Sequence, residues 1–75
     1  TLSYDLPENS FVNITIYNLL GREVRTLVNQ NQDAGFKSVI WNGSNSFGKP
    51  VSAGVYIYQI RAGKYVHTNK MLLLK

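Results

Sequence analysis

The sequence predicts an all-β fold, an antiparallel β-sandwich of about seven short strands. Apolar residues recur at every second position in several segments, whereas no window of about a dozen residues keeps the apolar spacing of an amphipathic helix. Turn-forming residues separate these segments at intervals of about eight to twelve residues, as in sandwiches and barrels. No connection is long enough to hold a crossover helix, so antiparallel pairing is expected throughout.

Two segments of clear alternation lie in the N-terminal half of the chain. Their apolar members are Leu2, Tyr4 and Leu6 in the first segment and Val12, Ile14 and Ile16 in the second. Pro7 and the polar residues after it predict a turn between them. Because alternate side chains of a strand point to opposite faces, each segment is expected to turn one face toward a core.

Residues 23–28 follow a turn over residues 18–21 and are less regular. Val24 and Leu27 are three residues apart, a spacing that a helical turn would also give. A β-bulge, which inserts one extra residue into a strand, is the interpretation we favour. Residues 29–35 are mostly polar and are expected to form a loop.

Trp41 organises the C-terminal half, where it ends an extended segment that includes Val39. A loop rich in glycine and asparagine is expected over residues 42–53. Tyr56, Tyr58 and Ile60 then share one face of a strand, and a turn at Ala62 and Gly63 leads to a last strand over residues 64–74. The predicted core consists of Tyr4, Val12, Ile14, Ile16, Val24, Leu27, Val39, Trp41, Tyr58 and Ile60. We expect two thin layers to close over these side chains and leave no cavity for a substrate.

Composition and size argue against an enzyme. For 75 residues the hydrophobic gain and the conformational entropy cost nearly balance, which leaves little stability to support a strained active site. The chain has no cysteine, hence no disulfide or thiolate metal site, and no apolar run approaches the about 20 residues of a membrane span. The net charge of +4 comes from dispersed basic residues, as on an ordinary solvated surface. Because Thr1 is neither an initiator methionine nor part of a signal peptide, a piece of a longer precursor is expected.

The loop over residues 42–53 contains two patterns that resemble ligand sites. Gly43 to Lys49 matches the start of a phosphate-binding loop, but Pro50 stands where a magnesium-binding serine or threonine is needed. Asn42 and Asn45 suggest a calcium loop, yet the loop contains no carboxylate. We interpret these asparagines as turn formers that accept hydrogen bonds from the nearby backbone.

The remaining candidates for chemistry are isolated. His67 is the only histidine and is expected on the solvent-facing side of the last strand. Tyr56 and Tyr58 on a basic domain suggest a platform for single-stranded nucleic acid, but apolar neighbours such as Ile57 favour a place in the core. The sequence therefore predicts no catalytic residue, no metal, no cofactor and no nucleic-acid partner.

Ordered motifs run through most of the chain. They are Leu2-x-Tyr4-x-Leu6-Pro7-Glu8, Val12-x-Ile14-x-Ile16 with the following Tyr17 to Asn29, Ala34-Gly35, Trp41-Asn42-Gly43, Gly48, Ser52-x-Gly54-Val55-Tyr56-x-Tyr58 and the terminal Lys70 to Lys75. Together they resemble the type A C-terminal sorting domains of the type IX secretion system, which are related to the immunoglobulin-like domain of flagellar hook-capping proteins. Two departures are that Asn42 stands where aspartate is commoner, and that the usual Asn-Pro segment before the first strand is missing.

The resemblance implies one immunoglobulin-like domain over residues 1–75 that sorts a secreted precursor and has no catalytic role. It implies a secretion translocon and a sortase as partners, and a location at the outer-membrane surface or outside the cell. By motif position, the recognition residues are Gly54, Tyr56, Lys70 and Lys75. Each also has a purely structural explanation: Gly54 begins a strand, Tyr56 fills the core, and the lysines keep an edge strand from aggregating.

A structural module is the alternative function. The same domain would then be appended to an extracellular enzyme, or would self-associate through its edge strands into a surface filament.

Overall fold

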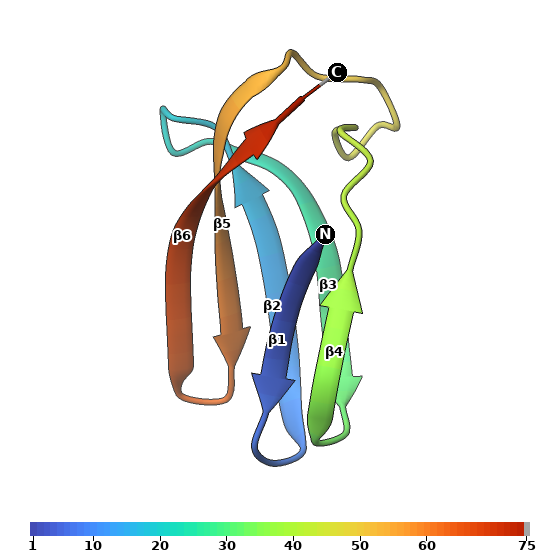
Figure 1. Ribbon diagram of the computed structural model, residues 1–75, viewed down its shortest axis with the longest axis vertical. Helices are drawn as coiled ribbons and strands as arrows, with labels where there is room; N and C mark the ends of the chain where they lie inside the picture. The colour runs from blue at the N-terminus through green and yellow to red at the C-terminus, as the bar shows by residue number, and fades with distance from the viewer. Residues whose placement is uncertain (75) are drawn as a thin grey trace.

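The computed structural model describes residues 1–74, which form six antiparallel strands (Figure 1). The strands are β1 (Leu2–Leu6), β2 (Ser10–Tyr17), β3 (Glu23–Gln32), β4 (Gly35–Val39), β5 (Gly54–Ala62) and β6 (Tyr65–Leu73). The predicted all-β, antiparallel sandwich is confirmed, with six strands where about seven were expected.

The two sheets of the sandwich differ in width. One contains only β1 and β4, whereas the other has four strands in the order β3-β2-β5-β6. Figure 1 shows β1 and β4 in front of β2 and β3, with β5 and β6 extending past them to one side. The narrow sheet therefore covers only part of the wide one.

The core is centred on β2, whose Val12, Ile14 and Ile16 are completely buried. Ile14 is paired with Ile60 of β5, so the alternating apolar side chains of the two strands lie on the same face of the wide sheet. Of the predicted core residues, Val12, Ile14, Ile16, Trp41 and Ile60 are buried, while Tyr4, Val24, Leu27, Val39 and Tyr58 are partly buried and pack against them. The predicted set left out Leu2, Leu6, Val28 and Ala62, which are also buried, while Tyr56 is buried as its apolar neighbours indicated.

Two irregularities in the β2–β3 ladder explain the three-residue spacing in β3. Ile14 is paired with Val28 and Thr15 with Thr26, so the register skips Leu27. A second shift lies between Ile16 and Tyr17 and skips Val24 in the same way. The prediction of a β-bulge over a helical turn is confirmed, and each bulge lets a partly buried apolar side chain pack against the core.

The prediction of a loop over residues 29–35 is wrong. Strand β3 continues to Gln32 and β4 begins at Gly35, so the connection is only two residues long. The polar residues of β3 are extended because they pair with Ser10 to Asn13 of β2, and they lie on an edge strand where water solvates their side chains. The Tyr4 hydroxyl also donates a hydrogen bond of 2.6 Å to Gln32 Oε1 and thus links the two sheets.

Two boundaries in the C-terminal half differ by a residue or two from the prediction. Trp41 lies just beyond the end of β4, and the tight turn consists of Gly63 and Lys64 because Ala62 is still part of β5. The loop over residues 42–53 is found where it was expected.

The expectation that the two layers leave no cavity is wrong at one side of the sandwich. An open groove of about 650 Å³ lies between β1 and the β5–β6 hairpin. Tyr4 and Ile60 of the predicted core line it, whereas Trp41 does not. The groove exists because the narrow sheet ends before it reaches β6.

Candidate recognition surface

The β5–β6 hairpin brings together three of the four residues implied in recognition. Gly54 begins β5 opposite Leu73, Tyr56 is paired with Met71, and Lys70 is paired with Ile57 on the outer face. Lys75 lies outside the described residues. Gly54, Tyr56 and Lys70 thus belong to the same end of one hairpin, although they do not share a surface.

Tyr56 is part of the core. Its ring packs edge-on against Trp41, with centroids 5.1 Å apart and an interplanar angle of 76°. Its hydroxyl donates a hydrogen bond of 2.6 Å to the Ser52 carbonyl oxygen, four residues before it. Because Tyr56 is buried, it cannot contact a partner directly, and its role is to fix the start of β5 against the preceding loop.

The same loop is held by polar groups around Trp41. The indole Nε1 donates a hydrogen bond of 2.8 Å to the Ser44 carbonyl oxygen, and the Arg25 guanidinium donates to the Ser44 hydroxyl. The backbone N–H of Val51 donates to the Gly43 carbonyl oxygen at 2.9 Å and closes the loop on itself. The loop is therefore a fixed part of the fold.

Asparagine side chains complete this loop. Asn45 Oδ1 accepts hydrogen bonds from the backbone N–H groups of Phe47 and Lys49, both at 3.0 Å. Asn42 Oδ1 accepts one from the Ser44 N–H at 3.1 Å. The interpretation of both asparagines as turn formers is confirmed, and the bonded N–H groups are those that a phosphate-binding loop would turn toward its ligand.

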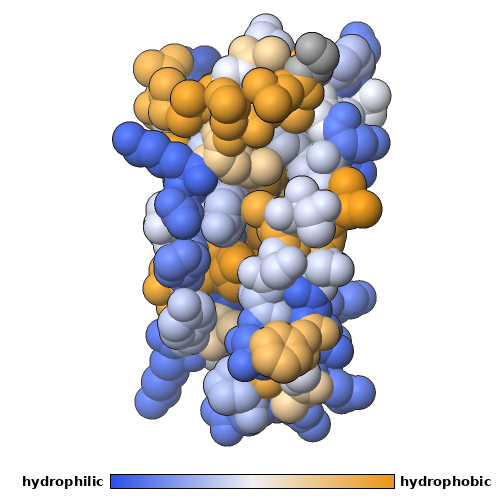
Figure 2. Space-filling view, viewed as in Figure 1, coloured by the Kyte–Doolittle hydropathy of each residue, from blue (hydrophilic) through white to orange (hydrophobic). Residues whose placement is uncertain are grey.

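Apolar side chains gather at the upper end of the molecule, over the end of β6 and the start of β5 (Figure 2). The leucines of the β2–β3 turn lie at this end too, because Tyr17 at the end of β2 is paired with Ile57 of β5. We define the upper apolar patch as the exposed residues Leu19, Leu20, Val55, Leu72 and Leu74. Leu72 is 61% exposed and Leu74 is 78% exposed. Exposed apolar groups gathered in this way mark a binding surface more often than scattered single ones do.

His67 is exposed on β6, but its pairing with Ile60 places it on the face that carries the core and not on the outer face that was expected. Its ring stacks on Tyr65 with centroids 6.3 Å apart and lies 6.5 Å from the ring of Tyr58. Among residues 1–74, no group of three or more histidine, cysteine or acidic side chains is placed to hold a metal ion. In the same range, no helix is long and apolar enough to cross a membrane.

Two features of this surface were not predicted from the sequence. The first is the exposure of Leu19 and Leu20, which an apolar pair inside a turn could have indicated. The second is the row formed by Tyr65, His67 and Tyr58, which depends on the pairing of β5 with β6.

Comparison with known proteins agrees with this architecture. Residues 1–67 match the model of a family described as the FlgD Ig-like domain. The chain belongs to this family. The relation to flagellar hook-capping proteins that the resemblance implied is thereby confirmed.

A solved FlgD structure from P. aeruginosa is also similar to this FlgD Ig-like domain. The TM-score is 0.73 and the sequence identity is 26% over 95% of this chain. The chain spans only 57% of the length of that solved chain. Among curated proteins no match was found.

Proposed function

We propose that this FlgD-type Ig-like domain is a non-catalytic C-terminal sorting domain, which directs a secreted precursor through the type IX secretion system to the cell surface. The observation that carries the proposal is the position of the upper apolar patch. The match to the FlgD Ig-like family ends at residue 67, whereas the resemblance to sorting domains continues through Lys70 to Lys75. The end of β6 and the residue after it contribute two of the five exposed residues of the patch, Leu72 and Leu74.

In this proposal the translocon reads the end of the β5–β6 hairpin. Leu72 and Leu74 offer apolar contact area, and Lys70, two residues before Leu72 on β6, adds a positive charge. β6 is an edge strand, so its outer backbone N–H and C=O groups are available for pairing with a strand of the receptor. Tyr56 and Gly54 have an indirect role in this proposal. They fix the register of the β5–β6 hairpin and do not contact the receptor themselves.

The proposal is tested by secretion of a reporter fused in front of the domain, in a bacterium that carries the type IX system. Deletion of residues 70–75, or the double substitution Leu72→Ser and Leu74→Ser, is expected to leave the reporter in the periplasm. The matched control is Phe36→Ser on β4, which replaces another exposed apolar side chain, 89% exposed, away from the hairpin. Normal export of the truncated form would rule the proposal out.

A structural module is the second candidate, supported by the similarity to FlgD and by the edge strands. The domain would then accompany an extracellular enzyme or assemble into a surface filament. Size-exclusion chromatography distinguishes self-assembly, which gives large species that grow with protein concentration, from a sorting domain, which remains monomeric. A reporter that is exported equally well without the domain would favour the accessory role.

A further inference from the structure

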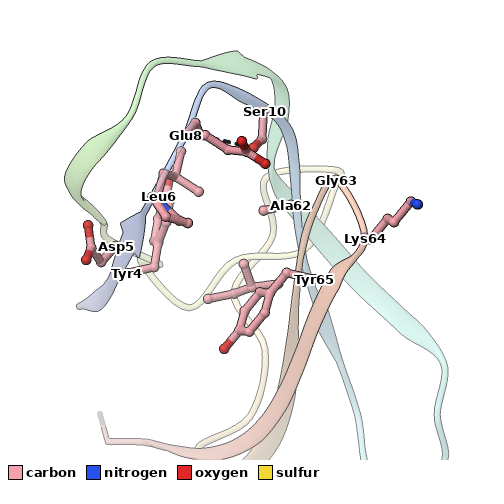
Figure 3. A pocket seen from close by; sticks show the side chains of 11 residues that line it. Tyr4, Asp5, Leu6, Glu8, Ser10, Ala62, Gly63, Lys64 and Tyr65 are labelled. Atoms are coloured by element: carbon pink, nitrogen blue, oxygen red, sulfur yellow. Dashed lines mark hydrogen bonds between the residues drawn. The ribbon is translucent and has the colours of Figure 1, made fainter.

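The groove between β1 and the β5–β6 hairpin is open to solvent and has a mainly apolar lining (Figure 3). Leu6 and Tyr4 form the wall on the β1 side, and Ile60, Ala62 and Tyr65 form the wall on the hairpin side. In Figure 3 the Tyr65 ring extends from its strand toward the β1 side. The groove thus lies between two strands of different sheets that do not pair with each other.

The inner face of β6 is uncovered along this groove. Cross-strand pairing places Tyr65 beside Ala62, His67 beside Ile60 and Asn69 beside Tyr58, so all three β6 side chains belong to the face that carries the core. All three are nevertheless exposed, because the narrow sheet ends at β1. A strand added next to β1 would cover them.

The backbone of β1 faces the same space. In the narrow sheet β1 is hydrogen-bonded to β4 along one edge only. The N–H and C=O groups that alternate toward its other edge are directed to the groove, where the free domain leaves them to water. One more strand would satisfy these groups and widen the narrow sheet to three strands.

A carboxylate lies at the mouth of the groove. Glu8 is one of four acidic residues in a chain of net charge +4, and it lines the groove next to Ser10. In Figure 3 the Lys64 side chain points away from the other lining residues, and Asp5 lies on the far side of β1. The local charge therefore favours a ligand with a basic group near Glu8.

From these observations we propose that the groove binds one extended segment of a partner protein by β-strand addition to β1. The segment carries apolar side chains at alternate positions, which pack on Tyr65 and its neighbours, and a lysine or arginine that meets Glu8. Backbone pairing supplies affinity, and the lining side chains supply selectivity. This inference does not depend on the proposed sorting function, since the upper apolar patch lies at the other end of the hairpin.

A second copy of the domain fits the groove less well than a single strand. In Figure 1 the wide sheet extends past β1 to β6, so the free edge of β1 lies inside the edge of the wide sheet. Edge-to-edge pairing of two β1 strands would bring the two projecting β6 strands into collision. A lone extended segment enters without this conflict.

The test uses a synthetic peptide of about nine residues, with alternating valine and threonine and one arginine at an end, long enough to span β1 at strand spacing. Hydrogen exchange of the domain is followed by NMR with and without about 1 mM peptide. The expected result is exchange slowed about tenfold or more at β1 amides, with the β3 edge unchanged.

Variants of single residues test which parts of the groove contribute to peptide binding. Tyr65→Ser is expected to weaken binding about tenfold, whereas Phe36→Ser on the outer face of β4 leaves it unchanged. Glu8→Lys is expected to reverse the preference between the arginine peptide and a glutamate peptide. The same peptide with proline at alternate positions is expected not to bind, because it lacks the N–H groups for the ladder.

Three results would overturn the proposal. The first is unchanged exchange at β1 with about 1 mM peptide. The second is concentration-dependent dimerisation of the free domain that protects β1, which would assign the groove to a second copy. The third is protection of β1 in a longer form of the same polypeptide without peptide, which would assign the groove to an intramolecular strand.

Discussion

Two loops of this domain have the same backbone chemistry but different surroundings. One runs over residues 18–22 and the other over residues 45–49. In each, the asparagine N–H donates to the carbonyl oxygen four residues on, and its own carbonyl accepts from the glycine N–H. In each, the asparagine Oδ1 also accepts from two further N–H groups, to give the same four hydrogen bonds.

The surroundings decide what each loop does. In the second loop the Ser46 N–H donates a hydrogen bond of 3.1 Å to the Val24 carbonyl oxygen, and the preceding Ser44 accepts from Trp41 and Arg25. The first loop instead turns Leu19 and Leu20 to the surface. The comparison teaches that a local hydrogen-bond motif fixes a turn, whereas tertiary contacts determine whether that turn also supports the core.

The largest loss of stability is expected on substitution of Trp41, whose indole is hydrogen-bonded to Ser44 just before the second loop. Trp41→Ala removes the edge-on contact with Tyr56 and leaves a cavity, so the free energy of unfolding should fall by about 3–5 kcal/mol. Equilibrium urea denaturation measures the change, with Trp41→Phe as a milder variant in case the alanine form does not fold. A loss below about 1 kcal/mol would show that the loop is not an integral part of the core.

The asparagines should differ although their hydrogen bonds are the same. Asn45→Ala is expected to cost about 2 kcal/mol, because the loop it holds is packed against Val24 and Trp41. Asn18→Ala should cost about half as much, since the backbone hydrogen bonds of that turn stay within residues 18–22 and no bond like that from Ser46 to Val24 depends on its geometry. Equal losses in urea denaturation would contradict the role given to the surroundings.

The glycines provide the control for this comparison. Gly21 has φ 81° and Gly48 has φ 78°, a conformation that alanine adopts only with strain. Nothing lies within 4 Å of a Cβ built at either position, so the cost is confined to the backbone. Gly21→Ala and Gly48→Ala should each lower the free energy of unfolding by about 1 kcal/mol. If the two losses in the free energy of unfolding differ by more than twofold, the local backbone strain of the two turns is not the same.

Most strands of this domain were predictable, because the alternation of apolar and polar residues that marks a strand is visible within the segment itself. Alternation marked β1, β2 and β5, and the irregular spacing of Val24 and Leu27 indicated a bulge that the β2–β3 register contains. Both asparagine loops were predicted as turns, but their common pattern of asparagine, two residues, glycine and a basic residue went unnoticed, although it is visible in the sequence.

The remaining features depend on which strands lie beside each other. Residues 29–32 look like a loop by composition, and only pairing with β2 makes them a strand. The groove could not be predicted, because the exposure of Tyr65 and His67 follows from a narrow sheet that covers half of a wide one. Sequence alternation tells which face of a strand is apolar, but not whether another layer covers it.

The smallest change in stability is expected for Leu20→Ser in the first loop. Leu20 is 80% exposed and contributes little to the core, so unfolding should shift by less than about 0.5 kcal/mol. If the upper apolar patch is a docking surface, the same substitution should reduce export of a fused reporter severalfold, because apolar contact area is lost where the partner binds. Phe47→Ser is the matched control, since Phe47 is the similarly exposed apolar residue of the second loop and lies outside the patch. Unchanged export with Leu20→Ser would separate the turn from the docking surface and leave the end of β6 as its remaining part.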